Sequence, residues 1–360
     1  MNYIRPVPRI LFSIGFMLHV LAGTAQTLGG SAVFSFLRLS AAPQQAALGG
    51  VNLSQPTDDP GMAFQNPALL HDRMHTRMHT VFNDLPAGVK AYHLSFAYHA
   101  RPSATTFLWG LHYMDYGSSV STDAAGNLLG RFRPVDWMMQ LSASHAYRNR
   151  WTGGLAVKFI HSRYGIFRSS GLAADLGLLY RDTARGLTAS VLLKNAGGQI
   201  RKYLGSSAEE LPFDLHAGIT RRLQQAPVAF SITAQRIHRF DIRYNDTLFN
   251  TSNGQPMERS KRFSLGKVMD HLILGTTLYI GDRIECQLGY NFLRRRELNI
   301  ANNRNGLNGF SAGVGARLGK LELRYARAHY QSGMAFNQLG LTLTMNRYLG
   351  LGKWGERIGW

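Results

Sequence analysis

The stretch 284–292 reads Ile-Glu-Cys-Gln-Leu-Gly-Tyr-Asn-Phe, and it decides the fold because every second residue in it is apolar. The apolar residues stand at the even positions, and Glu, Gln, Gly and Asn stand between them. In a β-strand, alternate side chains point to opposite faces, so this segment has one apolar face and one polar or small face. The stretch therefore predicts a strand whose two faces meet different surroundings.

The same alternation recurs along most of the chain and is clearest after residue 91. The predicted strands are about 8–12 residues long, whereas strands in soluble proteins average roughly 5–6 residues. A tilted membrane strand needs roughly 9–11 residues. We predict about fourteen strands, near 74–83, 91–99, 107–116, 135–146, 151–160, 171–181, 187–195, 212–221, 227–236, 270–280, 284–293, 309–318, 321–330 and 337–345.

The connections between these strands alternate in length. Every other one is short: 100–106, 147–150, 182–186, 222–226, 281–283 and 319–320. Most of the others are longer: 117–134, 161–170, 196–211, 237–269 and 294–308. Short turns on one side and long loops on the other are typical of an outer-membrane barrel, whose turns face the periplasm. An even number of strands also places both ends of the barrel on the side of the short turns.

A soluble β-sandwich is the alternative architecture, because its strands alternate too. It predicts shorter strands, no asymmetry of loop length and a richly charged second face. Here the second face carries Gly, Ser, Thr, Ala and scattered charges, which suit a crowded lumen. We therefore predict an all-β, transmembrane, antiparallel outer-membrane β-barrel of about 14 strands, with a short N-terminal plug-like segment.

Aromatic residues near the predicted strand ends agree with this fold, because amphipathic rings favour the headgroup level of a membrane. Ordinary core packing is the alternative explanation for each of them. They are Trp109, Tyr113, Trp137, Trp151, Tyr180, Tyr290 and Phe292.

The first 25 residues predict export. Arg5 and Arg9 are followed by an apolar run over 10–21 and by small residues that end at Ala25. This order is that of a signal peptide, and the run is too short to span a membrane comfortably. We therefore divide the chain into a signal peptide (1–25), an N-terminal periplasmic or plug segment (26–70) and an outer-membrane β-barrel (71–360). The expected location is the cell outer membrane.

Composition excludes several classes of protein. Hydrophobic residues make up 45% of the chain and aromatic residues 11%, enough to bury a core, so the chain is not disordered. The single cysteine, Cys286, excludes a disulfide scaffold. The formal charge of +19 suits an anionic partner. Export makes a phosphate-bearing lipid surface a better candidate than nucleic acid, which we exclude as a partner.

Three histidines, His71, His75 and His79, stand four residues apart. On a helix or on a strand they share a face, as metal ligands can. On a strand Arg73 and Arg77 share that face as well, and their charges oppose a cation. We therefore expect the inward, polar side of a first strand here and no metal site.

Nothing in the sequence indicates an enzyme. The glycines of 313–319 are spaced differently from those of a dinucleotide fingerprint and lie in a strand pattern without a following helix. Cys286 lies on an apolar face, where it acts as a small hydrophobic residue. We expect no catalytic residues and no cofactor.

Basic residues gather in the long loops, where guanidinium groups suit phosphate. Lipopolysaccharide or an acidic partner protein is the expected contact, and a merely solvated face is the alternative. The candidate contacts are Arg259, Lys261, Arg262, Arg294, Arg295 and Arg296.

The segment 26–70 differs from the rest, because it is rich in Gly and Ala and lacks long alternation. A short helical stretch is expected near 40–48, and the segment could enter the lumen or cap the periplasmic mouth. Its motifs are Phe-Ser-Phe-Leu-Arg-Leu-Ser (34–40), Gln-Ala-Ala-Leu-Gly-Gly (45–50), Asp58-Asp59 and Asn-Pro-Ala-Leu-Leu (66–70). At these residues the chain resembles the PorQ family of the Bacteroidetes type IX secretion system, which is similar to PorV and to FadL-type transporters.

The resemblance implies a non-enzymatic, 14-stranded barrel with a plug-like N-terminal segment. It also implies membership of a surface attachment complex with PorU, PorV and PorZ, in which the barrel anchors PorZ and helps to attach cargo to lipopolysaccharide. Many outer-membrane barrels end in an aromatic residue on the last strand, whereas about 15 residues follow the last strand predicted here.

Two other functions stay open. One is FadL-like transport of long-chain hydrophobic substrates, which an apolar lumen pocket would favour; the other is a soluble secreted binding protein. The residues expected to face inward are polar, which weighs against a lipid site. They are His93, Ser95, His99, His112, Gln140, Ser142, Asp175 and Lys194.

Overall fold

The computed structural model describes residues 32–123, 125–148, 150–242, 263–298, 306–319, 321–331 and 334–347. The signal peptide predicted at 1–25 and the candidate contacts Arg259, Lys261 and Arg262 lie outside the described residues. Among the described residues, no helix is both long enough and apolar enough to cross a membrane.

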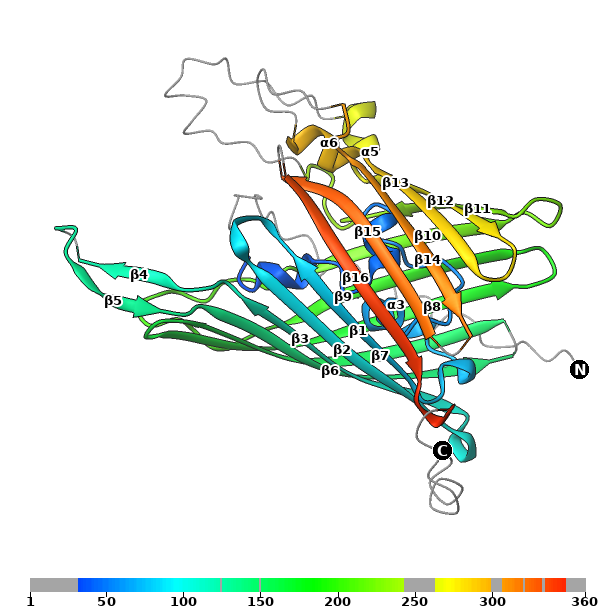
Figure 1. Cartoon of the computed structure of the whole chain (residues 1–360), viewed down its shortest axis with the longest axis horizontal. Coiled ribbons are helices and arrows are strands. Elements are labelled where there is room, and N and C mark those ends of the chain that lie inside the picture. The colour runs from blue at the N-terminus through cyan, green and yellow to red at the C-terminus, as the bar shows by residue number, and fades with distance from the viewer. Residues whose placement is uncertain are drawn as a thin grey trace, which may run out of the picture. The chain divides into compact units, whose positions relative to one another are not determined.

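Fourteen antiparallel strands form a closed barrel (Figure 1). They are β1 (Arg77–Asp84), β2 (Lys90–Ala100), β3 (Thr105–Asp115), β6 (Val135–Tyr147), β7 (Trp151–Tyr164), β8 (Phe167–Asp182), β9 (Leu187–Arg201), β10 (Asp214–Arg222), β11 (Val228–Ala234), β12 (Leu272–Ile280), β13 (Ile284–Asn291), β14 (Phe310–Leu318), β15 (Leu321–Gln331) and β16 (Met334–Thr344). Each strand pairs with its neighbours in the chain order just given, and β16 closes the barrel against β1. Every predicted strand corresponds to one of these fourteen, so the predicted fold class is confirmed.

The connection predicted at 117–134 contains a hairpin that the sequence analysis missed. Its strands are β4 (Ser119–Thr122) and β5 (Leu128–Phe132), which pair only with each other. Figure 1 shows the hairpin as an extension beyond β3 and β6. Strands of four and five residues are too short to show a period, which explains the miss.

The loop predicted at 161–170 is wrong, because β7 and β8 continue through most of it. Only Gly165 and Ile166 separate the two strands, and Gly165 has the positive φ of 62° that a tight turn requires. β9 likewise continues to Arg201, past its predicted end at 195. The apolar alternation stops earlier than the strands do, because the last outward residues are polar or charged.

Two short helices also lie in predicted loops, α5 (Leu265–Asp270) after β11 and α6 (Phe292–Leu298) after β13. Apart from the connection predicted at 161–170, the predicted difference in length between the connections at the two rims is present in the structure. The hairpin, both helices and the segment between β9 and β10 lie at one rim, which we call the loop rim. The connections at the opposite turn rim, such as 281–283, are short.

The outward face of the barrel wall is apolar. Large side chains on alternating positions are 46–62% exposed, including Leu141, Leu155, Val157, Leu176, Phe230 and Leu288. A continuous apolar surface of this kind is the lipid-facing band of an outer-membrane barrel. Inward residues are polar as predicted: His93, Ser95, His112, Gln140 and Asp175 are buried.

The chain ahead of β1 lies inside the barrel (Figure 1). It consists of short helices joined by turns: η2 (Ser35–Arg38), α2 (Pro43–Ala47), α3 (Pro60–Gln65), η3 (Pro67–Leu69) and η4 (Asp72–Met74). α2 contacts β13 to β16, α3 contacts β1 to β3, and η3 contacts β6 to β8, so the segment meets the wall on several sides. We call residues 32–76 the plug.

Candidate functional site

Glycines on the inward face of the wall let the plug backbone come close. A Cβ atom added at Gly154 would lie 2.3 Å from the backbone nitrogen of Ala68, and one at Gly289 would lie 2.2 Å from that of Gly49. Both distances are shorter than any allowed contact, so only glycine fits there. The small residues of the wall therefore form a seat for the plug. Plug side chains, rather than plug backbone, come within 3.0 Å of such a Cβ atom at Gly110, Gly177, Gly275, Gly313 and Gly340.

Hydrogen bonds join the plug to the wall in the same region. The Ser311 hydroxyl donates to the Ala47 carbonyl oxygen (2.8 Å), and the Gly49 amide donates to the Ser311 oxygen (3.0 Å). On other strands, Ser144 donates to the Leu70 carbonyl (2.8 Å) and Gln140 to that of Phe64 (2.9 Å). Buried backbone groups of a segment without a sheet or long helix need such partners. The wall supplies them.

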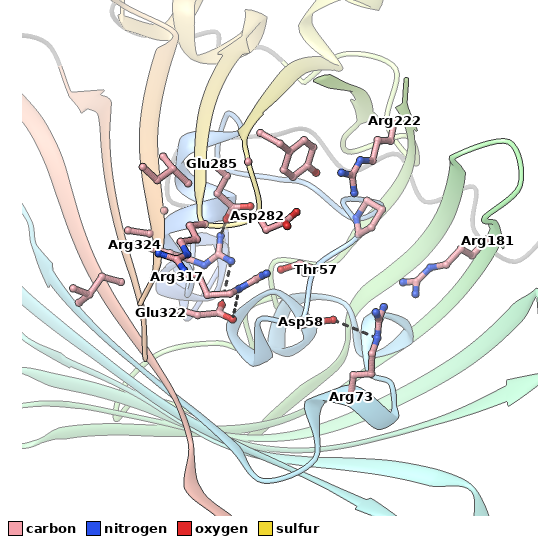
Figure 2. Close-up of a pocket in the computed structure, with 18 residues that line it drawn as sticks. Thr57, Asp58, Arg73, Arg181, Arg222, Asp282, Glu285, Arg317, Glu322 and Arg324 are labelled. Carbon is pink, nitrogen blue, oxygen red and sulfur yellow. Dashed lines mark hydrogen bonds and ion pairs between the residues drawn. The ribbon is translucent and has the colours of Figure 1, made fainter. Parts of the chain in front are cut away.

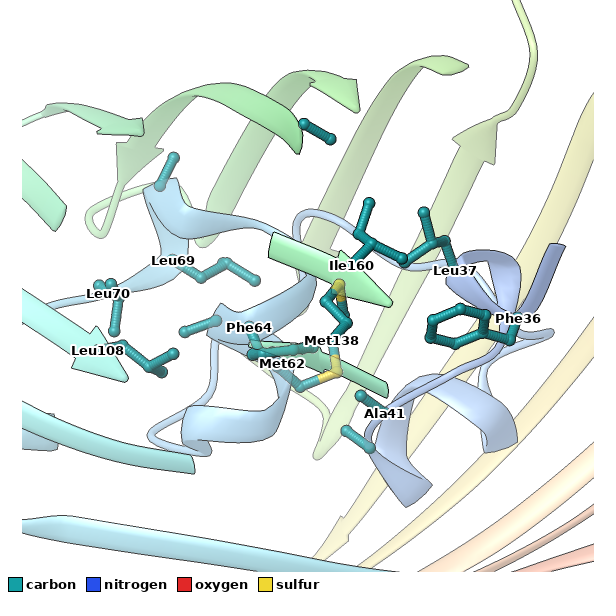
Figure 3. Close-up of a cluster of buried hydrophobic side chains, with 14 of the residues drawn as sticks. Phe36, Leu37, Ala41, Met62, Phe64, Leu69, Leu70, Leu108, Met138 and Ile160 are labelled. Atoms are coloured by element: carbon teal, nitrogen blue, oxygen red, sulfur yellow. The ribbon is translucent and has the colours of Figure 1, made fainter. Parts of the chain in front are cut away.

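An apolar cluster fixes the plug against β3, β6 and β7 (Figure 3). Phe64 and Leu69 of the plug lie near Leu108, Met138 and Ile160, and all five side chains are buried. Burial of such side chains stabilises the docked plug by about 1.5–3 kcal/mol each relative to full exposure. The plug is therefore packed like a protein core on this side.

Charged groups tie the plug to β1 and β15. The Asp59 carboxylate accepts from the Gly61 amide at the start of α3 (2.8 Å). It also lies 3.0 Å from Nδ1 of His79 and 3.4 Å from Nε of Arg324. Arg324 contacts Glu285 and Glu322 as well. A fully buried carboxylate needs this set of partners, so Asp59 joins the plug helix to two wall strands.

Asp58, the neighbouring residue, has a perturbed acidity. Burial raises the pKa of its carboxyl, but the hydrogen bond and charge of His71 and the charges of Arg73 and Arg77 outweigh burial and lower that pKa to about 2. His71 Nε2 lies 3.3 Å and Arg77 Nη2 3.7 Å from the carboxylate. Asp58 is therefore ionised at neutral pH.

The plug has a pocket on the side of the loop rim, which we call the outer pocket. Its volume is about 230 Å³, and it is lined by the plug, by β9, β10, β13 and α6, and by the residues that follow β11. Leucines and cations line it together, with two acids. The leucines are Leu37, Leu39, Leu53, Leu192, Leu293 and Leu298; the charged groups are Arg38, Lys194, Arg236, Arg294, Asp214 and Glu297.

A second pocket of about 230 Å³, the inner pocket, lies at the turn rim (Figure 2). Arg73, Arg181 and Arg222 lie on one side of it, and the Arg222 guanidinium stacks 4.4 Å from the ring centre of Tyr279. Glu322 on the other side is paired with arginines, including Arg317 at 3.1 Å. This pocket is polar and charged, in contrast to the leucine-lined outer pocket.

The structure places three predicted contact residues in α6, where each has partners within the protein. Arg294 donates to the Gly49 carbonyl of the plug (3.1 Å), and Arg295 donates to that of Gly306 (2.8 Å). Nε of Arg296 lies 3.0 Å from an Asp270 carboxylate oxygen. Their predicted contact with phosphate or a partner stays a prediction, as does that of Arg259, Lys261 and Arg262.

The three spaced histidines have three different partners. His71 lies beside Asp58, His79 beside Asp59, and His75 accepts a hydrogen bond from the His99 amide (3.1 Å). β1 begins only at Arg77, so the expectation that all three lie on a first strand is wrong. Within the described ranges, no group of three His, Cys, Asp or Glu side chains is placed to hold a metal ion.

Sequence reasoning missed the wall partners of the plug. Asp59 was noted as part of a motif without a role, and Arg324 was not singled out. No local signal links them, because Asp59 and Arg324 are far apart in the chain. The small residues on the inward faces were the available signal for a filled lumen.

No protein-family model matches the sequence, and no curated protein is significantly similar to it. Among solved structures, a TodX ΔS2S3 mutant monoaromatic hydrocarbon channel is 13% identical, with a TM-score of 0.48, over 83% of this chain and 97% of that one. A Pseudomonas aeruginosa FadL homologue is 10% identical, with a TM-score of 0.45, over 84% and 98%. CdiB from Acinetobacter baumannii is 10% identical, with a TM-score of 0.33, over 74% and 59%. These are similarities of barrel architecture at low identity.

Proposed function

We propose that this protein is a FadL-like outer-membrane transporter that takes up an elongated hydrophobic molecule with an anionic end. The outer pocket carries this proposal, because leucines and cations line the same cavity at the loop rim. Small-molecule sites combine an apolar lining with a few polar groups that orient the ligand. The leucines would contact a hydrocarbon chain, and Arg236 or Lys194 would pair with a carboxylate or sulfonate.

Passage through the barrel requires the plug to move. The outer and inner pockets lie on opposite sides of the plug, and the residues between them are buried against the wall. A ligand that binds the displaced arrangement better than the docked one would shift the equilibrium toward displacement. The docking contacts at the glycine seat are non-covalent, so the wall can keep its strand pairing while the plug shifts.

Binding of oleate and of oleyl alcohol to the detergent-solubilised protein tests the proposal. Arg236→Gln should weaken oleate binding about tenfold or more, because a hydrogen bond to a charged group contributes about 1.5–3 kcal/mol. It should leave oleyl alcohol binding unchanged. Arg239→Gln is the matched control, since Arg239 lies outside the pocket lining and faces Glu210 at 3.8 Å. Equal effects of both variants, or no oleate binding at all, would refute the assignment.

A second candidate function is the anchoring of a secreted partner, as the resemblance to the PorQ family implies. The β4–β5 hairpin favours it, because Leu128 and Leu129 are 77% and 67% exposed on an extension beyond the barrel wall. Exposed apolar residues on such an extension suit a protein contact. The partner would be PorZ-like, in a complex with PorU and PorV.

Leu128→Asp with Leu129→Asp tests this candidate. The double variant should release the partner into the medium while the barrel stays in the outer membrane. Deletion of 237–269 or of 294–308 should do the same if those loops contribute. Retention of the partner on cells in all three variants would count against anchoring by this surface, without bearing on oleate binding.

A further inference from the structure

A row of paired residues marks the membrane boundary near the loop rim. Strand register sets its members opposite one another across seven neighbouring strands. Ring centres of Phe82 and Tyr92 are 5.6 Å apart, and those of Trp137 and His161 are 5.5 Å apart. Aromatic side chains in this position sit at the headgroup level of a bilayer. Its first five members, which we call the aromatic row, are Phe82, Tyr92, Tyr113, Trp137 and His161, and the row continues through Ser170 and Arg201.

A charged row follows two residues further toward the loop rim, roughly 7 Å along the strands. In its first half Lys90 stands between two acids, Asp84 and Asp115. Arg133 adds an ion pair with Asp115. The second half differs, because Arg163 stands directly opposite Arg168. Acids and bases therefore alternate over β1 to β3, and only bases remain over β7 and β8.

Arg201 joins these two arginines through a β-bulge. The β8–β9 register shifts between Ser170 and Gly171, so that Gln199 pairs with Gly171 and Arg201 pairs with Ser170. Bulges re-aim side chains, and this one sets Arg201 opposite a residue of the outward face, diagonal to Arg168. All three arginines are exposed. We call Arg163, Arg168 and Arg201 the arginine cluster.

Among the described residues, the cluster is not paired with an acid. Across the part of the chain that the structure describes, no acidic side chain lies within ion-pair distance of any of the three arginines. Like charges directly opposite on neighbouring strands are destabilising, so repulsion between Arg163 and Arg168 destabilises the wall when no anion is bound there. An anion that bridges the guanidinium groups would remove this repulsion.

We propose that the arginine cluster binds the phosphate group of an anionic lipid in the membrane leaflet around the loop rim. Guanidinium forks match phosphate geometry and form strong, charge-assisted hydrogen bonds. The neighbouring aromatic row fixes the height of the cluster at the headgroups, and Phe159 and Leu172 lie on the same outward face below it. A lipid bound there has its phosphate at the arginines and its acyl chains along the apolar wall.

Native mass spectrometry of the full mature protein in detergent tests the site, with dioleoyl phosphatidylglycerol and dioleoyl phosphatidylcholine as probes. The two lipids share their acyl chains and a phosphate group. Phosphatidylglycerol carries a net negative charge, whereas the choline group of phosphatidylcholine makes that lipid neutral overall. The wild type should retain phosphatidylglycerol about tenfold better. The triple variant Arg163→Gln, Arg168→Gln, Arg201→Gln should lose this preference.

A matched control removes three charges from the turn rim: Arg185→Gln, Arg221→Gln, Arg283→Gln. It should keep the wild-type preference, and both triple variants should keep the gel-mobility shift on heating that reports an intact barrel. Equal retention of the two lipids by the wild type would overturn the proposal. That result is expected if an acidic protein loop, rather than a lipid, occupies the arginine cluster. Loss of preference in the control as well would also overturn it.

Discussion

Replacement of a seat glycine should undock the plug without opening the barrel wall. In Gly154→Ala, the new methyl group would lie 2.3 Å from the Ala68 nitrogen and 2.4 Å from the Pro67 carbonyl carbon. Both are backbone atoms, so η3 must shift away from β7 by more than half an ångström. Gly153, its neighbour on β7, has no atom within 4 Å of an added methyl group. Gly153→Ala is therefore a control on the same strand.

The size of the effect follows from these contacts. Overpacking of a close-packed site costs typically about 1–3 kcal/mol. A shift of η3 also strains the hydrogen bond from Ser144 to the Leu70 carbonyl (2.8 Å), which contributes about 0.5–1.5 kcal/mol. The total of about 1.5–4.5 kcal/mol corresponds to a roughly 10- to 2,000-fold larger undocked population.

Amide hydrogen exchange in detergent measures this population directly. Amides of 60–70 should exchange faster by that factor in Gly154→Ala, and at the wild-type rate in Gly153→Ala. Strand amides should stay protected in both variants. The reasoning is refuted if plug amides of Gly154→Ala exchange as in the wild type, or if the strands of that variant lose protection to the same extent as the plug.

Three further predictions concern the charged groups of the lumen. Because the pKa of the Asp58 carboxyl is lowered, its ionised form stabilises the folded protein fully above about pH 4, and this stabilisation is lost as the pH falls toward 2. Calorimetric melting temperatures of the wild type and of Asp58→Asn should therefore differ at about pH 5 and converge near pH 2. Lys158→Met leaves the buried Asp175 without its 2.6 Å partner and should lower the unfolding free energy in urea by about 3–5 kcal/mol, whereas adding Asp175→Leu should recover much of that loss. Asp59→Ala removes a helix cap worth about 1 kcal/mol and an anion beside buried Arg324, so exchange of plug amides should rise at least as much as in Gly154→Ala; unchanged exchange would show that the cap is dispensable.

The wall was predictable because its signal is local. Alternation within each segment marks the strands, as in 284–291, and the length of each connection marks its rim. Prediction failed where that signal ends: the outward residues Arg163 and Arg168 interrupt the apolar face, although strand pairing continues beyond the hydrocarbon. A hairpin of very short strands at 119–132 carries no period to detect.

The site was less predictable, because it depends on contacts between distant parts of the chain. The seat for Gly49 is built by Gly289 and Ser311, and neither pairing has a local trace in the sequence. The outer pocket combines plug leucines with three cations from outside the plug, Lys194, Arg236 and Arg294. Inward glycines and serines indicate a crowded lumen, but only the folded barrel shows which plug atom each of them contacts.

Disulfide trapping in the outer membrane tests most directly whether the N-terminal segment fills the barrel. The Ser54 hydroxyl of the plug lies 2.8 Å from the Thr220 hydroxyl of β10, and both residues already carry a Cβ atom, so cysteines at these positions bring two sulfur atoms within bonding reach. With Cys286→Ser as background, Ser54→Cys combined with Thr220→Cys should form an internal crosslink on oxidation. Ser54→Cys combined with outward-facing Ile219→Cys should not. No crosslink in the first pair, or equal crosslinking in both, would contradict a plug seated in the lumen.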